Sequence, residues 1–224
     1  MHSGKSASVT KNILIFPGLA ADERMFSLLQ QSLPAVRVIR YLLPDKKETL
    51  AAYAQRMAAT IPERQETIFI GVSFGGILAQ ELAHYIPAKK IILISSISSS
   101  AQLSALLAFF RKFPVYDWLS AQQIKCIVIW AGRLFTKKSN EETALFESMV
   151  HDADIQLIRW GIRMTLCWKQ ETAPANVIHI HGSHDRLFPV RKIPADFIIE
   201  GGQHFMIVQR ATEIRTLLMK LLQL

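Results

Sequence analysis

From Thr67 to Ala83 the chain reads TIFIGVSFGGILAQELA. An apolar run of strand length comes first, and a helix-favouring run follows the glycines. Gly71 and Gly75 stand two positions either side of Ser73, in the pattern G-x-S-x-G. Glycines there allow the sharp strand-to-helix turn that raises a serine hydroxyl above the edge of a sheet. We therefore predict that Ser73 is a nucleophile; the alternative is a glycine-rich turn with an incidental serine.

A nucleophilic serine needs a base that takes its proton and an acid that orients the base. In serine hydrolases built on a parallel sheet, the chain order is Ser, then Asp or Glu, then His, each after a strand. Asp185 follows the strand-like run 176–181, and His204 follows the run 196–200. The interval between them has room for a turn, a short helix and one strand. We predict Asp185 as the acid and His204 as the base.

Other histidines and carboxylates fit these roles less well. His181 and His184 lie in the acid loop, where we expect packing at the strand end or a surface position, and His179 lies mid-strand, as a core residue would. Residues 94–100, which hold the acid in some serine hydrolases, contain no carboxylate. Asp185 is therefore the acid that the sequence favours.

A metal site is not expected. His181 and His184 have a glycine between them and lack the helical i, i+4 spacing of a zinc protease pair. Cys126 and Cys167 are far apart, with no C-x-x-C pattern.

Three segments resemble the nucleophile elbow, acid loop and histidine loop of the α/β-hydrolase superfamily: Gly71–Gly76, His181–Asp185 and Gly202–His204. The resemblance extends over nearly the whole chain. It implies that Ser73 attacks an acyl carbon, and it implies no cofactor.

The same resemblance implies an oxyanion hole made of two backbone N–H groups. One belongs to the residue after the nucleophile, Phe74, and the other to the loop after the first strand, where we nominate Leu19. Family members often have His-Gly in this loop, and Pro17 here replaces the histidine that usually braces it.

Strand-like and helical runs alternate from residue 10 to about residue 97: the strand-like runs are 12–16, 36–41, 67–71 and 90–95, and the helical ones lie near 22–32, 49–61 and 74–86. This alternation predicts an α/β fold: a mostly parallel sheet of about six strands with helices on both faces, without leading antiparallel strands. Residues 98–173 are helical in pattern and rich in aromatics, and the resemblance identifies them as a cap inserted into a core made of residues 1–97 and 174–224. We expect most of these aromatics to form the cap's own core. The tail 205–224 is expected to be one amphipathic helix.

Composition excludes several classes of protein. Half of the 224 residues are hydrophobic, so one core can form without disulfides. No apolar run has the length of a membrane span and no secretory signal is present, so we expect a cytoplasmic protein without a membrane partner. The net charge of +8 comes from scattered pairs such as Lys46-Lys47, which argues against a nucleic-acid partner. The charge is compatible with an anionic substrate or an acidic carrier protein.

The sequence therefore predicts a serine hydrolase that cleaves a small carboxylic ester through an acyl-enzyme, as a monomer or homodimer. A thioester, an amide, a carbon–carbon bond, a lyase using the same triad and a non-catalytic binding protein all stay open, because one fold hosts all of them. The aromatic insert favours short to medium acyl chains.

Overall fold

The computed structural model describes residues 12–33, 36–62, 67–136 and 139–223. Within these ranges the core is a six-stranded sheet in the order β2-β1-β3-β4-β5-β6, and every neighbouring pair is parallel. The strands are β1 Asn12–Phe16, β2 Val36–Val38, β3 Thr67–Val72, β4 Ala88–Ile94, β5 Val177–Gly182 and β6 Phe197–Ile199. The predicted sheet of about six strands is confirmed.

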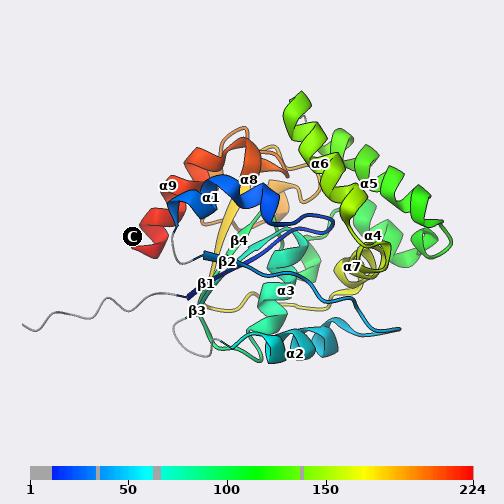
Figure 1. Cartoon of the computed structure of the whole chain (residues 1–224), viewed down its shortest axis with the longest axis horizontal. Helices are drawn as coiled ribbons and strands as arrows, with labels where there is room; N and C mark the ends of the chain where they lie inside the picture. The colour runs from blue at the N-terminus through cyan, green and yellow to red at the C-terminus, as the bar shows by residue number, and fades with distance from the viewer. Residues whose placement is uncertain (1–11, 34–35, 63–66, 137–138, 224) are drawn as a thin grey trace, which may run out of the picture.

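Helices cover both faces of the sheet (Figure 1). Leu14, Phe16 and other alternate strand residues pack against α2 (Leu50–Thr60) and α3 (Phe74–Leu82). The intervening residues, such as Ile13 and Ile15, pack against α1 (Ser27–Ser32) and α9 (Ala211–Leu222). Side chains alternate between the two faces along a strand, and both faces are buried, so these strands read as continuous apolar runs.

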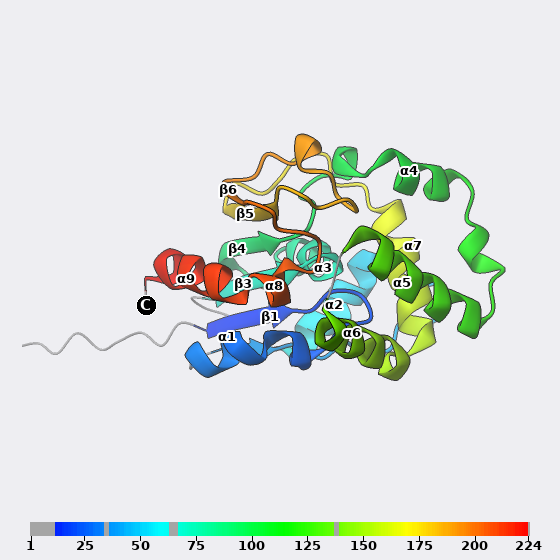
Figure 2. The same ribbon diagram turned by 90° about the horizontal axis from the view of Figure 1, so that it is seen from above.

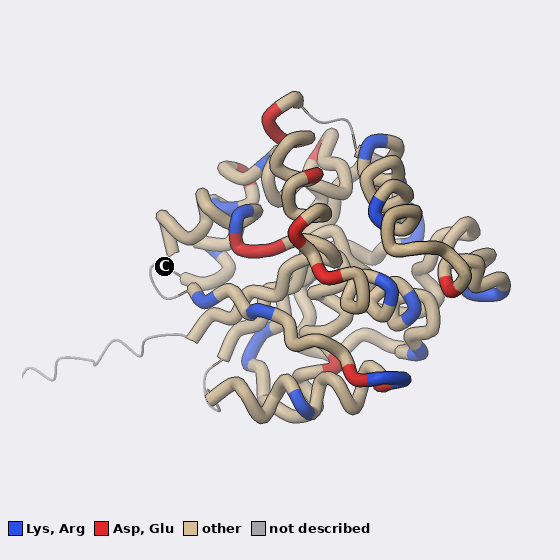
Figure 3. The backbone as a smooth tube through the Cα atoms, turned by 45° about the vertical axis from the view of Figure 1, so that its right-hand side comes forward, with Lys and Arg blue, Asp and Glu red and all other residues tan. Residues whose placement is uncertain are grey.

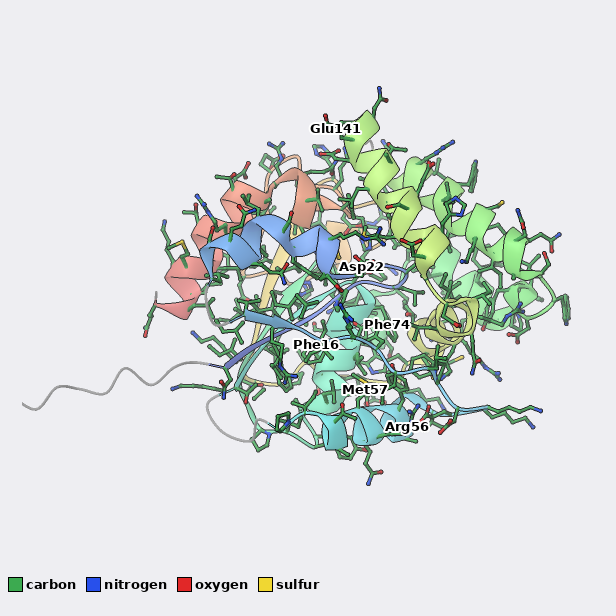
Figure 4. The ribbon with its side chains drawn as sticks, viewed as in Figure 1. Phe16, Asp22, Arg56, Met57, Phe74 and Glu141 are labelled. Atoms are coloured by element: carbon green, nitrogen blue, oxygen red, sulfur yellow. The ribbon has the colours of Figure 1, made fainter. Side chains whose placement is uncertain are left out.

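Figure 4 shows the layer between the sheet and α2, with Phe16, Phe74 and Met57 labelled. All three side chains are buried. Phe16 ends β1 and Phe74 begins α3, so this layer reaches the edge of the sheet at which the strands end.

Two predicted elements differ from the structure. The run 36–41 is a strand only from Val36 to Val38, after which the chain leaves the edge of the sheet and carries Tyr41 toward the loop after β1. The tail is two helices, α8 (Met206–Gln209) and α9, because Arg210 has φ −119° and ψ 30°, outside the helical region. The two helices have different partners, since α8 packs on the 3₁₀ turn η1 (Glu23–Phe26) and α9 packs on α1.

Helices fill the segment between β4 and β5, as predicted. They are the 3₁₀ turn η2 (Ser100–Gln102), α4 (Ala105–Lys112), the 3₁₀ turn η3 (Val115–Asp117), α5 (Ala121–Phe135), α6 (Asn140–Asp152) and α7 (Ile155–Cys167). Serine or aspartate side chains cap the N-termini of all four α-helices. A last 3₁₀ turn, η4 (Val190–Lys192), lies between β5 and β6. The boundaries of a cap at residues 98 and 173 stay a prediction.

The helical segment lies at the end of the molecule away from the C-terminus (Figures 1 and 2). Its helix α7 is anchored on the core, because the Trp160 indole donates to the Glu48 carbonyl at 2.8 Å and the Trp168 indole donates to Glu81 at 2.7 Å. None of the helices in the described ranges combines the length and the apolar character that crossing a membrane requires.

Candidate active site

Ser73 lies at the turn between β3 and α3, in a backbone conformation that few non-glycine residues adopt. Its φ is +52° and its ψ is −120°. Two hydrogen bonds with the end of β4 and the loop after it hold Ser73 there: the Ser73 N–H donates to the Ile94 carbonyl at 3.0 Å, and the Ser96 hydroxyl donates to the Ser73 carbonyl at 2.7 Å. The turn is therefore fixed by the sheet as well as by its own sequence.

The glycines of the turn are required by close backbone contacts. A Cβ at Gly71 would collide with the backbone of Gly76, and a Cβ at Gly75 would collide with the carbonyls of Phe16 and Pro17. The second contact brings the loop after β1 directly against the start of α3. Glycine at both positions thus lets the serine turn and the β1 loop share one edge of the sheet.

The structure brings the three predicted side chains together. The His204 Nε2 lies 3.0 Å from the Ser73 Oγ, and its Nδ1 lies 2.8 Å from the Asp185 Oδ2. Because an ionised carboxylate only accepts, the Nδ1–H donates to Asp185, and Nε2 is left to accept the proton of the serine hydroxyl. The arrangement can therefore move a proton from Ser73 to His204.

Asp185 is buried and its carboxylate is fully engaged. Oδ1 accepts from the N–H groups of Leu187 and Phe188, each at 2.9 Å, and Oδ2 accepts from His204. Burial raises the pKa of Asp185, but the charge and hydrogen bond of His204, with smaller contributions from His181 and the Phe188 N–H, outweigh it and leave that pKa below its ordinary value. The acid stays ionised beside the imidazole that it orients.

His181 is a second buried contact of the acid loop. Its Nε2–H donates to the Phe188 carbonyl at 2.8 Å and lies 3.6 Å from the Asp185 Oδ2. Burial lowers the pKa of His181, and it lowers the pKa of the neighbouring His179 to about 3. Both imidazoles are therefore neutral at pH 7. His181 holds the acid loop, while His184 is exposed on the surface.

The predicted oxyanion donors lie on two segments that meet beside the serine. A Cβ built on Gly18 would lie 3.6 Å from the Ser73 Cβ, so the loop carrying Leu19 passes directly over the nucleophile. In the part of the chain that the structure describes, the N–H groups of Leu19 and Phe74 donate to no protein acceptor. This leaves both groups available, as an oxyanion hole requires.

Tyr41 braces this loop, and the sequence analysis missed it. Its hydroxyl donates to the Pro17 carbonyl at 2.5 Å, and its ring packs edge-on against Phe74 with centroids 6.0 Å apart. Burial raises the pKa of Tyr41 well above its usual value, so the hydroxyl stays a donor. Only the position of Tyr41 at the end of the predicted strand 36–41 pointed toward this contact.

A cavity of about 360 Å³ opens above Ser73 and His204, and its wall is almost entirely apolar. Of the aromatics in the helical segment, Phe110, Tyr116 and Phe146 contribute to the wall. A larger surface hollow of about 1140 Å³ lies between residues 44–51 and α7, but none of the three predicted catalytic side chains lines it. The smaller cavity is therefore the candidate substrate pocket.

The expectation that the aromatics form the insert's own core is wrong for four of them. Phe109, Phe113, Trp118 and Trp130 are exposed. On α4 the inward residues Leu107 and Phe110 are half-buried and line the pocket, whereas Phe109 faces solvent, so helical spacing by itself did not specify which apolar side chains are covered.

Neither a protein-family model nor a curated protein matches this chain. Solved structures do. A thermophilic esterase from Thermogutta terrifontis superposes with a TM-score of 0.71 at 14% identity, over 94% of this chain and 89% of that one. For MenH from S. aureus the TM-score is 0.72 at 14% identity, with 97% and 95% covered. The chain has the α/β-hydrolase fold.

A thioesterase with this α/β-hydrolase fold is also similar. RedJ-Thioesterase from the prodiginine biosynthetic pathway in Streptomyces coelicolor matches with a TM-score of 0.61 at 14% identity, over 94% of this chain and 91% of that one. At such identities the likeness establishes the α/β-hydrolase fold alone. In this fold the nucleophile turn stands at the top of the sheet, which is where Ser73 lies.

Proposed function

We propose that the protein is a serine hydrolase that cleaves carboxylic esters or thioesters, with Ser73 as nucleophile, His204 as general base and Asp185 as the acid that orients the base. The observation that carries the proposal is the continuous hydrogen-bonded chain from the Ser73 Oγ through His204 to Asp185, at the floor of an apolar cavity. The solved esterases and thioesterases with the same fold support the same class of reaction.

In the first step, the Ser73 Oγ attacks the acyl carbon while its proton passes to the His204 Nε2. The carbonyl π electrons move onto oxygen, and the resulting oxyanion lies between the N–H groups of Leu19 and Phe74. When the tetrahedral intermediate collapses, the bond to the alcohol or thiol breaks, and His204 returns the proton to that leaving group. Water then attacks the acyl-enzyme by the same route, releases the acid and restores Ser73.

Each part of the site has a defined role in this scheme. Asp185 fixes the tautomer of His204 and stabilises the imidazolium that forms in both steps. Tyr41 holds the loop that presents the Leu19 N–H, through its bond to the Pro17 carbonyl. A preset oxyanion donor of this kind is worth about 3 kcal/mol of transition-state stabilisation.

The helical segment 98–173 acts as a cap in this proposal, since it contributes more than half of the residues that line the pocket, chiefly from α4, α5 and α7. A cavity of about 360 Å³ is small for a ligand site, which favours short to medium acyl chains over long lipid chains. The apolar wall also excludes water from the acyl-enzyme while the leaving group departs.

Labelling with a fluorophosphonate probe tests the nucleophile. The Ser73 oxygen displaces fluoride from phosphorus, so intact-mass analysis of native protein shows one adduct, which Ser73→Ala loses. An adduct of equal yield on Ser73→Ala, or none on native protein, contradicts the proposal.

A panel of p-nitrophenyl esters and acyl thioesters of graded length then tests the substrate class. We expect the highest kcat/KM for short to medium acyl groups. Product analysis separates a hydrolase from a lyase with the same triad, because only a hydrolase releases an acid that carries oxygen from isotopically labelled water. Labelling of Ser73 without turnover of any ester or thioester refutes the assigned reaction but not the nucleophile.

A further inference from the structure

The outer surface of the helical segment carries bulky apolar side chains that the described parts of the protein leave uncovered. Of the twelve exposed large hydrophobic side chains in those parts, eight lie between Leu106 and Leu134. Leu106 and Phe109 lie three positions apart on one face of α4, and Phe113 directly follows the end of the helix. The rings of Phe109 and Phe113 are 4.9 Å apart, which makes that face continuous.

Helix α5 also has an exposed apolar face. Ile127, Trp130 and Leu134 recur at i, i+3 and i+7, and Trp130 is 63% exposed. In the segment between α4 and α5, Trp118 is 83% exposed. We call the exposed faces of α4 and α5, together with Trp118, the apolar rim.

The apolar rim borders the candidate substrate pocket at two residues. Leu106 of α4 is 48% exposed and Ile127 of α5 is 47% exposed, yet both also line the cavity above Ser73. The same two helices therefore form the inner wall of the pocket and an apolar surface outside it. Exposed apolar side chains that gather on neighbouring elements are typical of an interaction site.

Basic residues predominate in the segment that carries the rim, although Arg133 of α5 is paired with Glu147 of α6. Residues 98–138 contain six Lys or Arg and a single acidic residue, Asp117. Arg111 and Lys112 are exposed at the end of α4, next to Phe113. Figure 3, in which this end of the molecule is turned toward the viewer, shows Lys and Arg positions along it. Apolar side chains flanked by basic ones are the pattern of helices that lie in the surface of an anionic membrane.

We propose that the apolar rim docks on an anionic lipid surface, with Trp118 and Trp130 in the headgroup layer and Arg111 and Lys112 against anionic headgroups. The pocket mouth then opens into the lipid, and an apolar acyl substrate enters without crossing water. The sequence analysis expected no membrane partner because it found no segment long enough to span a membrane. Docking on the surface of a bilayer requires no spanning segment, so the proposal differs from that expectation.

Other occupants fit the rim less well. A second copy of this chain brings the same positive charges to the contact, where they repel. A folded acidic protein needs a matching pocket for each protruding tryptophan, whereas the headgroup layer of a bilayer accommodates them without one. Docking does not require the reaction proposed for Ser73, so either proposal can fail without the other.

Co-sedimentation with lipid vesicles tests the docking. The full chain carrying Ser73→Ala, which cannot turn over an ester lipid, is mixed with vesicles of phosphatidylcholine with or without phosphatidylglycerol. We expect binding to the vesicles that contain phosphatidylglycerol, weakening as salt is added, and a shift of tryptophan fluorescence to shorter wavelength. Trp160 and Trp168 are buried, so the shift reports on Trp118 and Trp130.

Variants locate the contact. Trp118→Ser with Trp130→Ser should lower the partition coefficient at least about tenfold, since two aromatic side chains leave the lipid. Arg111→Gln with Lys112→Gln should lower it about 30-fold, because each charge contributes about fivefold. Matched controls on other elements are Lys46→Gln with Lys47→Gln, and Ile198→Ser on β6, whose side chain is also exposed. Both controls should bind as the unaltered chain does.

The Trp118→Ser, Trp130→Ser protein also serves as a folding control. Neither tryptophan lines the pocket, so labelling of Ser73 by fluorophosphonate should be unchanged in this background. Three results overturn the docking proposal: no binding to either type of vesicle, equal loss of binding in the controls, or a dimer in sedimentation velocity that Trp130→Ser abolishes. The last result would assign the rim to a second copy of the chain.

Discussion

The acid loop around Asp185 and the outer helices α4 and α5 border the same pocket but are built in opposite ways. Every polar atom of the Asp185 carboxylate has a partner, and the loop is further held by His181 and Phe188. Helix α4 buries none of its residues. The side chains proposed to transfer a proton are therefore held in place by hydrogen bonds, whereas the helices through which we expect the substrate to enter are only partly packed.

The largest expected difference between the two regions is in catalysis. Asp185→Asn should lower kcat on a soluble p-nitrophenyl ester by about 10⁴-fold, because an amide no longer holds the productive tautomer of His204. Trp130→Ser on α5 should change the same kcat less than about twofold, since Trp130 lies outside the pocket. Steady-state kinetics on both proteins, with circular dichroism as a folding control, checks this. Similar losses of kcat in Asp185→Asn and Trp130→Ser would contradict the expected difference between the two regions.

A second contrast concerns two glycines. Gly75→Ala places a Cβ against the backbone carbonyls of Phe16 and Pro17, which cannot move aside, and should cost about 3 kcal/mol or more of unfolding free energy. Gly132→Ala on α5 meets only the ring of Phe146, which can rotate, and alanine favours a helix over glycine by about 0.5–1 kcal/mol. We expect a net change below about 1 kcal/mol for Gly132→Ala in urea unfolding. Equal destabilisation would show that α5 is as tightly fixed as the serine turn.

Tyr41→Phe tests whether the hydrogen bond from Tyr41 to the loop after β1 contributes to catalysis. Losing the hydroxyl frees the Pro17 carbonyl and loosens the loop that carries the Leu19 N–H, which should lower kcat about 10- to 30-fold while KM changes less than about threefold. The ring and its packing on Phe74 remain. A matched loss of thermal stability with unchanged kcat would instead assign Tyr41 a purely structural role.

The last expected effect is absent at neutral pH and appears only in acid. Burial, with a smaller contribution from the neighbouring His181, depresses the pKa of His179 to about 3. Because the unfolded chain takes up that proton near pH 6.5 and the folded protein does not, stability is full above about pH 6.5 and falls as the pH drops toward 3, by up to about 1.4 kcal/mol per pH unit.

His179→Leu removes this titrating group and keeps an apolar side chain of similar size. Its stability should therefore decline less steeply than that of the native protein between pH 6.5 and 4, as measured by urea unfolding at each pH. Parallel curves for the two proteins would show that His179 does not contribute to acid sensitivity.

Sequence alone determined the parts of this protein that depend on local patterns and chain order. The glycines around Ser73 mark the turn because only glycine fits there, the apolar runs mark buried parallel strands, and Asp185 and His204 follow strands that must end at one edge of the sheet. The structure places these three side chains within hydrogen-bonding reach of one another.

Only the tertiary structure decided which distant groups support the site and which apolar side chains stay uncovered. Tyr41 reaches Pro17 because β2 ends early, and His181 reaches Phe188 because the acid loop folds back over β5. Phe109 of α4 and Trp130 of α5 have the helical spacing of core residues, yet both are exposed. Periodicity specifies that a helix has an apolar face, whereas burial of that face depends on what packs against it in the tertiary structure.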